Sequence, residues 1–191
     1  GEYWIDPQTA MLYLRPPTVG AQDFVLSVGS GIFELQGASN SVSFHSLTLI
    51  AARETAIRCG ASLGAGAFRD CQARNVVVSN CTIWGMGDGA IAVAVSPNAG
   101  AGLGWQVHGC NISSTGTIAI GLHGGDASTL QSSGHVVANT TVKHYGRLSY
   151  GFTPAIEISG VGTRVINNEL SHGNGQALMW SGNNHMIEAN V

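Results

Sequence analysis

The chain has 191 residues, of which 44% are hydrophobic and only 10% charged, with a formal net charge of −3. A typical domain is roughly 25% charged, and disorder goes with few apolar residues and a high net charge, so this composition excludes a disordered chain. The 27 glycines exclude long helices. A single lysine and an isoelectric point of about 6.1 argue against a nucleic-acid partner. No apolar run reaches the ~18 residues of a membrane span.

The first twenty residues predict a β-hairpin. Two apolar segments, 3–6 and 11–14, flank a four-residue loop that contains a proline, which is a common hairpin pattern. We expect residues 1–20 to cap or flank the domain that follows.

A repeated unit occupies the rest of the chain. Each copy reads V-x-x-small-x-I, then a turn, then A-I-x-apolar, as in 78–83 followed by 90–93 and in 107–112 followed by 119–122. Repeats of this length are typical of solenoids and arrays. Equivalent positions of successive copies, spaced by 34, 29, 30, 28 and 22 residues, are Leu47, Cys81, Cys110, Thr140, Asn168 and Asn190.

Each copy contains two short strands that alternate apolar and polar residues. Neither strand can bury its apolar face alone, so successive copies are expected to stack and share one core. No segment has the periodicity of a helical repeat, and a propeller blade needs about 40 residues. The sequence therefore predicts an all-β, right-handed parallel β-helix of about six coils over 24–191. Asparagines are expected at its bends, where they tolerate a positive φ, at Asn80, Asn139 and Asn167.

Four cysteines allow three disulfide pairings, and the sequence alone does not choose among them. Cys59 and Cys71 flank a glycine-rich loop that a bridge would close. Cys81 and Cys110 occupy equivalent repeat positions and are expected to be small buried side chains. No C-x-x-C pair is present, so we expect no structural zinc site.

Several segments together carry a resemblance to a known family. They are E-Y-W-I-D-P-Q-T-A-M-L-Y-L-R-P-P, G-G-D-A-S-T-L, Y-G-R-L-S-Y-G-F-T-P-A, S-G-V-G-T-R-V-I-N-N-E-L and S-G-N-N-H-M-I-E-A-N, at 2–17, 124–130, 145–155, 159–170 and 181–190. The chain resembles bacterial and algal right-handed parallel β-helix repeat proteins, close to β-helical glycoside hydrolases and polysaccharide lyases. The resemblance implies one domain over 1–191 taken from a longer chain with flanking coils or domains, an extracellular or cell-surface location, and a polysaccharide or oligosaccharide partner.

Two positions depart from the pattern of similar proteins. Asn174-Gly175 stands where those proteins often have Pro-His, and Asn184 stands where they often have Asp. A histidine and an aspartate that act in chemistry elsewhere are therefore replaced, which favours an altered or inactive site.

Candidate catalytic residues follow from the strand columns. Adjacent coils lie ~4.8 Å apart, and the outward column beside Ala-Ile is predicted to contain Arg58, Ala92, Gly121, Glu157 and Met179. The column two residues further on is predicted to contain His123, Ser159 and Ser181. Small neighbours would leave Glu157 and His123 in a shallow groove.

A glycosidase needs two carboxyl groups. We expect Asp126 and Glu157 to form the pair, with Asp88 at the turn of the coil below. His123, His172 and His185 complete the predicted catalytic set. The predicted substrate-binding residues are Arg147, Tyr145, Trp84, Asp88 and Asn184, of which Trp84 and Tyr145 would stack on sugar rings.

Two alternatives remain open. A lyase or epimerase acting on uronates would need a base, and a cation or Ca²⁺ to neutralise the substrate carboxylate; Lys143, His144, Arg147 and His172 are the candidates. The other alternative is a non-catalytic glycan-binding or structural scaffold. We expect no bound metal and no cofactor, except Ca²⁺ if the protein is a lyase.

Overall fold

The computed structural model describes residues 2–15, 25–64, 67–96, 99–149 and 151–191. Over these residues the protein contains strands and turns but no helix. Consequently, no described helix has the length and apolar character needed to cross a membrane.

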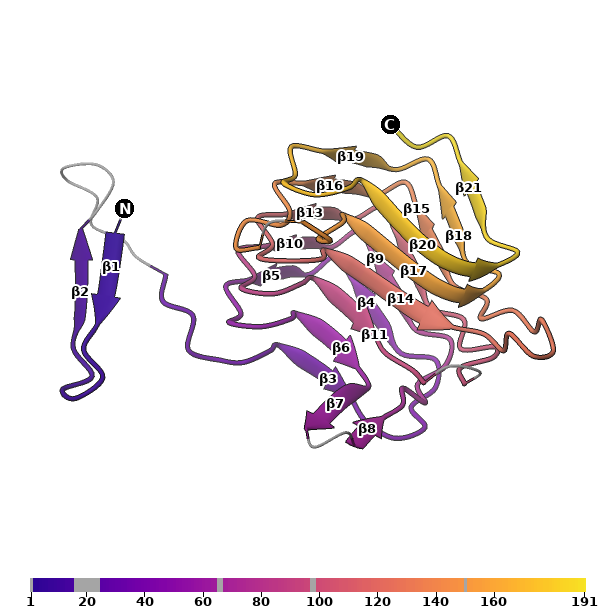
Figure 1. Ribbon diagram of the computed structural model, residues 1–191, viewed down its shortest axis with the longest axis horizontal. Coiled ribbons are helices and arrows are strands. Elements are labelled where there is room, and N and C mark those ends of the chain that lie inside the picture. The colour runs from indigo at the N-terminus through magenta and orange to yellow at the C-terminus, as the bar shows by residue number, and fades with distance from the viewer. Residues whose placement is uncertain (1, 16–24, 65–66, 97–98, 150) are drawn as a thin grey trace.

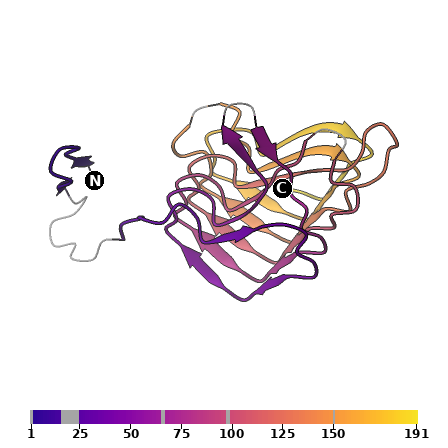
Figure 2. The ribbon, with the colours of Figure 1, turned by 90° about the horizontal axis from the view of Figure 1, so that it is seen from below.

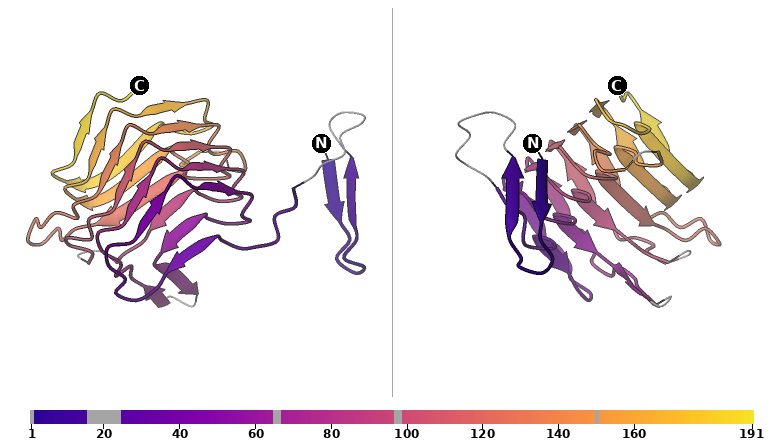
Figure 3. Two further views of the ribbon diagram at one scale, coloured as in Figure 1. Left: turned by 180° about the vertical axis from the view of Figure 1, so that it is seen from behind. Right: turned by 60° about the vertical axis from the view of Figure 1, so that its left-hand side comes forward.

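An antiparallel hairpin forms the N-terminus, with β1 (Glu2–Ile5) paired to β2 (Leu12–Arg15). This confirms the predicted hairpin. It lies to one side of the stacked strands in Figure 1 and in the left-hand view of Figure 3. Its apolar side chains Leu12 and Leu14 line a pocket together with Leu26 and Leu148, so the hairpin flanks the stack.

All the remaining strands except β7 (Ala61–Gly64) and β8 (Ala67–Arg69) form three parallel sheets that the chain visits in a fixed order (Figure 1). Sheet I contains β3 (Phe33–Leu35), β6 (Ile57–Cys59), β11 (Ile91–Val93), β14 (Ile120–Gly124), β17 (Ile156–Val161) and β20 (Leu178–Asn183). Sheet II contains β4 (Ser43–His45), β9 (Val77–Ser79), β12 (Gln106–His108), β15 (Val136–Ala138), β18 (Arg164–Ile166) and β21 (Met186–Glu188). Sheet III contains β5 (Thr48–Ile50), β10 (Thr82–Trp84), β13 (Asn111–Ser113), β16 (Thr141–Lys143) and β19 (Glu169–Ser171).

One coil is one passage through sheets I, II and III. The expected all-β architecture is confirmed, and the three stacked parallel sheets are compatible with a parallel β-helix. The sequence repeat contained two strands per copy, whereas a full coil has three. The short passage from sheet II to sheet III explains the difference, because β9 and β10 are separated by only Asn80 and Cys81 and read as one strand in the sequence.

Residues with a positive φ occupy equivalent bends in successive coils. At the bend between sheets II and III, Asn80, Asn139 and Asn167 have φ of 52°, 51° and 54°, as the sequence predicts. The bend that precedes sheet II carries a second such column, which includes Gly134 and Asn184. Asparagine and glycine suit these positions because they adopt a positive φ at low cost.

The core consists of aligned apolar ladders, one from each sheet. Side chains from sheet II alternate between the interior and solvent, so that Val78, Val107, Val137 and Val165 are all fully buried. Burial of like side chains on successive coils fixes the register, since a shift by one residue would expose every one of them. The same alternation directs the intervening residues of sheet I outward.

A second hairpin interrupts the second coil, between β6 and β9. After β6 the chain forms β7 (Ala61–Gly64) and β8 (Ala67–Arg69), which pair antiparallel. Seen from below, this hairpin stands out from the side of the stack (Figure 2). Cys59 and Cys71 at its base are disulfide-bonded, which selects the bridge that the sequence left open.

Candidate functional site

The outer face of sheet I carries the two predicted columns. Parallel pairing aligns Arg58, Ala92, Gly121, Glu157 and Met179 in one row. The same pairing aligns His123, Ser159 and Ser181 in the next row. Both column predictions are confirmed, and the first row extends one coil further, to Glu34.

Two adjoining pockets of about 300 and 220 Å³ lie on this face, and His123 lines both. The smaller pocket lies over Ala92 and Gly121, whose short side chains leave the space, and Glu157 also lines it. Gly124 and Gly160 contribute to the larger pocket. Because both pockets are lined by His123, we refer to the two together as the cleft.

Glu157 and His123 are neighbours in this cleft. The Glu157 Oε1 atom lies 4.0 Å from His123 Nε2, and both side chains are partly exposed. The His123 ring leans back over Gly121, because a Cβ at that glycine would lie 3.9 Å from Nε2. A carboxylate and an imidazole at this separation can exchange a proton through a small movement or one water.

Asp88 lines the same pocket as Glu157. It lies at the corner between β10 and β11, where the hydroxyl of Thr55 donates to Asp88 Oδ2 at 3.0 Å and the hydroxyl of Thr117 donates to Oδ1. Both threonines also line the pocket. The structure therefore brings Asp88, which was predicted to bind substrate and was not part of the predicted carboxylate pair, into the same pocket as Glu157.

Asp126 is engaged by its own turn. Its Oδ1 accepts hydrogen bonds from the Ser128 backbone N–H and hydroxyl at 2.8 and 2.6 Å. These bonds lower the pKa of Asp126, with the Ser128 hydroxyl as the largest cause. The described residues that line the two pockets do not include Asp126. The carboxylate is thus exposed and holds a loop in place.

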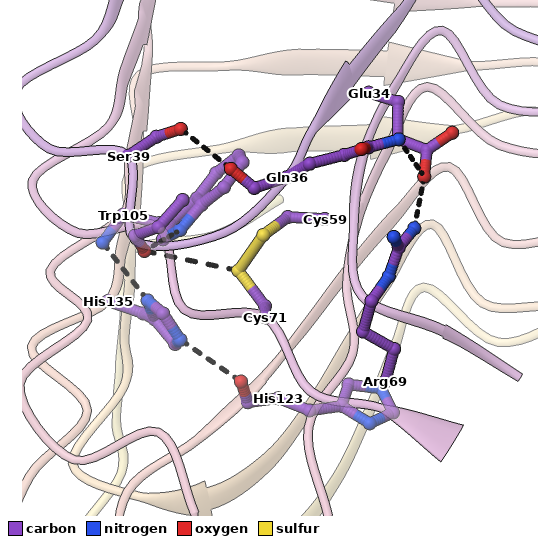
Figure 4. Close-up of a disulfide and its surroundings, with 10 residues drawn as sticks. Glu34, Gln36, Ser39, Cys59, Arg69, Cys71, Trp105, His123 and His135 are labelled. Atoms are coloured by element: carbon purple, nitrogen blue, oxygen red, sulfur yellow. Dashed lines mark hydrogen bonds and ion pairs between the residues drawn. A yellow bond between two sulfur atoms is a disulfide. The ribbon is translucent and has the colours of Figure 1, made fainter. Parts of the chain in front are cut away.

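A buried histidine supports the cleft from behind (Figure 4). His135 is fully buried. Its Nδ1 accepts the backbone N–H of Trp105 at 3.1 Å, so Nε2 carries the proton and donates to the His123 carbonyl oxygen at 3.2 Å. Burial lowers the pKa of His135 to about 4. The sequence analysis did not single out His135. The signal that could have found it is its position in the repeat, directly before a sheet II strand, which Trp105 occupies one coil earlier.

His185 repeats this arrangement at the end of the stack. Its Nδ1 accepts the backbone N–H of Thr163 at 3.2 Å, and its Nε2 donates to the Ser181 carbonyl oxygen at 3.0 Å. Both ring nitrogens of this predicted catalytic residue are therefore engaged by backbone. Asn184 immediately before it has φ 56° and forms the bend.

His172 lies at the opposite corner of the coil, after β19. Its ring centroid lies 5.3 Å from that of His144 one coil below, and its Nδ1 is 3.0 Å from Ser171 Oγ. Within the described part of the chain, neither pocket of the cleft is lined by His172. The structure does not bring this predicted catalytic residue together with Glu157.

The predicted sugar-binding residues Trp84, Tyr145 and Arg147 lie along sheet III and its corner. Trp84 is 42% exposed on the outer face of that sheet. Tyr145 is buried, and a Cβ at Gly173 would lie 2.0 Å from its ring. The prediction that Tyr145 stacks on a sugar is therefore wrong, because its ring faces are covered. Arg147 donates to the Ser114 carbonyl oxygen at 2.9 Å and braces a loop.

Asn174-Gly175, one of the two departures from the pattern of similar proteins, occupies a tight structural position. Asn174 donates to the Gly146 carbonyl oxygen at 3.2 Å. At Gly175 a Cβ would lie 2.5 Å from the Thr153 carbonyl oxygen, so the local packing leaves no room for a side chain. Asn174-Gly175 therefore holds the loop that precedes β20.

An ion-pair network marks the N-terminal end of sheet I. Arg58 donates to Glu34 at 3.0 Å and to Glu54 at 2.8 Å, and Arg69 from β8 also pairs with Glu34. Figure 4 shows Arg69 reaching Glu34 near the Cys59–Cys71 bridge. The hydrogen bond to Arg58 lowers the pKa of Glu34, and the bond to Glu34 raises the pKa of Arg58.

The remaining cysteines are buried and unpaired. Cys81 and Cys110 are free thiols within the core, as expected. Burial raises the pKa of Cys110 to about 11. The described residues contain no group of three or more His, Cys, Asp or Glu side chains suited to hold a metal ion.

The fold and cleft define an all-β protein of three stacked parallel sheets with a carboxylate-bearing groove on one of them. Comparison of the chain with protein families, curated proteins and solved structures finds no significant match.

Proposed function

We propose that the protein is a carbohydrate-active, right-handed parallel β-helix that hydrolyses glycosidic bonds of a polysaccharide in the cleft of sheet I. A right-handed winding is favoured because parallel strands joined by crossovers almost always follow that hand. The observation that carries the proposal is the pocket lined jointly by Glu157, His123 and Asp88.

Two carboxyl groups in one pocket suit glycoside hydrolysis. One group protonates the leaving oxygen and the other activates water or attacks the anomeric carbon. The bond between the anomeric carbon and the bridging oxygen breaks, and water supplies a hydroxyl to the first and a proton to the second. We assign these tasks to Glu157 and Asp88, since these two carboxylates line one pocket and Asp126 is not among its described lining residues. His123, 4.0 Å from Glu157, assists proton transfer.

The arrangement of cations favours hydrolysis over elimination from a uronate. Elimination needs a positive charge beside the substrate carboxylate. Lys143 is paired with Glu169 at 2.7 Å on sheet III, and Arg147 bonds to a backbone oxygen. On the face of sheet I, Arg58 is already held by two glutamates. A neutral polysaccharide therefore fits the cleft better than a polyanionic one.

A secreted or cell-surface location fits the disulfide. Such bonds persist in oxidising compartments and are rare where glutathione keeps thiols reduced. The Cys59–Cys71 bridge stabilises a hairpin next to the cleft, where an extracellular enzyme acting on polysaccharides would benefit from it.

The test measures new reducing ends released from neutral glucans, xylans and mannans. Wild-type protein is expected to release them, and Glu157→Gln and Asp88→Asn are each expected to lower the rate about 100-fold or more. Asp126→Asn should retain activity. Glu188→Gln, on the exposed outer face of sheet II, is the matched control.

Three outcomes would contradict the proposal. New ultraviolet absorbance from an unsaturated product of a uronate polymer would identify a lyase. Glycan binding that survives Glu157→Gln, with no product from any substrate, would identify a scaffold. Activity that depends on Asp126 and not on Asp88 would restore the pair first predicted from the sequence.

A further inference from the structure

The outward row of sheet I contains an open stretch bounded by charged side chains. Between Arg58 and Glu157 the row has only Ala92 and Gly121. Three coil steps of ~4.8 Å separate the strands of Arg58 and Glu157 by roughly 14 Å. Along the row toward the N-terminus, the free space beside Glu157 therefore extends over only two coils before it reaches Arg58.

Arg58 is fixed across the row and does not move freely. Its two terminal nitrogens donate to Glu54 and Glu34 on different coils. Both contacts are charge-assisted hydrogen bonds, which are stronger than neutral ones. Arg58, Glu34 and Glu54 thus form a cluster of paired charges at the N-terminal end of the row, which we call the Arg58 ridge.

The β7–β8 hairpin supports this ridge from the outside. Arg69 from β8 binds the same Glu34 carboxylate, and the Cys59–Cys71 bridge holds the base of the hairpin. The ridge is therefore tied to the hairpin through the Glu34 carboxylate.

The ridge separates two cavities on sheet I. Arg58 and Glu34 line a small pocket of about 90 Å³ on the N-terminal side. On the other side, the described residues that line the pocket of Glu157 and Asp88 do not include Arg58. Toward the C-terminus, in contrast, the cleft continues past His123 to Ser159 and Ser181.

We propose that the Arg58 ridge closes the substrate groove at one end, so that the enzyme acts from a chain end and releases a short oligosaccharide of fixed length. This inference rests on the proposed function and specifies its mode of action. The terminal sugar lies over Ala92 and Gly121 against the ridge, and the rest of the chain leaves past Ser159 and Ser181. Because the charges of Arg58 and Arg69 are balanced by Glu34 and Glu54, the terminal sugar is uncharged.

The experiment compares viscosity with reducing ends on the soluble polysaccharide that the wild-type protein cleaves. Reducing ends are expected to accumulate while viscosity stays nearly constant, because interior bonds are not cut. A hexasaccharide of the same linkage, labelled at its reducing end, should yield one short product from the first time points.

Opening the ridge should change the product length. Arg58→Ala is expected to yield products of several lengths, with at least a tenfold rise in the share longer than the wild-type product. The control is Arg164→Ala, an exposed arginine on sheet II. Thermal unfolding followed by circular dichroism checks that both variants fold, and the wild-type viscosity measurement needs no variant.

The outcomes distinguish this inference from the proposed function. Rapid loss of viscosity, mixed early products from the wild type, or an unchanged product length in folded Arg58→Ala would each overturn the chain-end inference while leaving hydrolysis intact. Absence of any new reducing ends would overturn both.

Discussion

The buried imidazole of His135 donates its Nε2–H to the main-chain oxygen of His123 at 3.2 Å. The neutral His135 thereby fixes the end of β14, which carries the His123 side chain into the cleft. The contact couples the stability of the stack to the geometry beside Glu157, because loss of the His135 bond frees the backbone at His123.

Stability should fall with acid through His135. Its folded-state pKa of about 4 lies below the ordinary value of 6.5, so the unfolded chain binds the proton more readily. The free energy of unfolding should be unaffected by this group above pH 6.5 and should decline by about 3 kcal/mol as the pH falls to 4. Urea unfolding at a series of pH values measures the effect.

The matched comparison uses two variants in the same pH series. His135→Gln removes the titrating group and should flatten the slope between pH 6.5 and 4. His108→Gln, on the outer face of sheet II, should keep the wild-type slope. Equal slopes for the wild type and His135→Gln would show that His135 is not responsible.

Gly160 should tolerate no side chain. It has φ 100°, and a Cβ there would lie 1.9 Å from the Gly124 carbonyl oxygen. Gly160→Ala is expected to cost about 3 kcal/mol or more from strain and overpacking. Gly37→Ala is the control, since it has φ 63° with open space around it and should cost about 1 kcal/mol. Equal losses of stability in chemical unfolding would contradict the close packing of Gly160 against the Gly124 backbone.

Removing the disulfide should weaken the protein without altering its core. Cys59 and Cys71 are 12 residues apart, and closing a loop of about this size stabilises a fold by about 3 kcal/mol. The double variant Cys59→Ala/Cys71→Ala should lose that amount in urea unfolding. A reductant should destabilise the wild type and leave the double variant unchanged; a reductant-sensitive double variant would point to a different bridge.

The two core thiols should resist alkylation in the folded protein. Cys81 and Cys110 are 1% and 3% exposed, and the raised pKa of Cys110, about 11, leaves little reactive thiolate near neutral pH. Mass spectrometry after iodoacetamide treatment should find no adduct in native protein and two adducts after unfolding without reductant. Native labelling of either residue would contradict its buried position.

Alternation of apolar and polar residues was enough to predict the rows on sheet I. Burial of Ile120 and Ile156 fixes their register, and Gly121 and Glu157 then follow on the outer face. That is why the sequence placed Glu157 and His123 in neighbouring columns, as the structure has them.

The sequence was less informative where loops decide the geometry. Asp126 was expected in the groove, and the structure shows that its Oδ1 accepts hydrogen bonds within the turn that follows Gly124-Gly125. Tyr145 was expected at the surface, and Gly173 on the next coil let its ring pack inward. The Arg58 ridge was not predicted, because Glu34 and Glu54 come from separate coils. Periodicity in the sequence does not show which charged residues of different coils meet.

Because the fold repeats coil by coil, the number of coils between Arg58 and Glu157 sets the length of the cleft. Each coil contacts only its neighbours, and each bend is set by its own positive-φ residue. Insertion of one coil between Arg58 and Asp88 would move the ridge about 4.8 Å further from Glu157 and leave Asp88, His123 and Glu157 on their present coils. Under the proposed chain-end hydrolysis, gain or loss of a single coil there would change the size of the product and leave the proposed reactive groups in place.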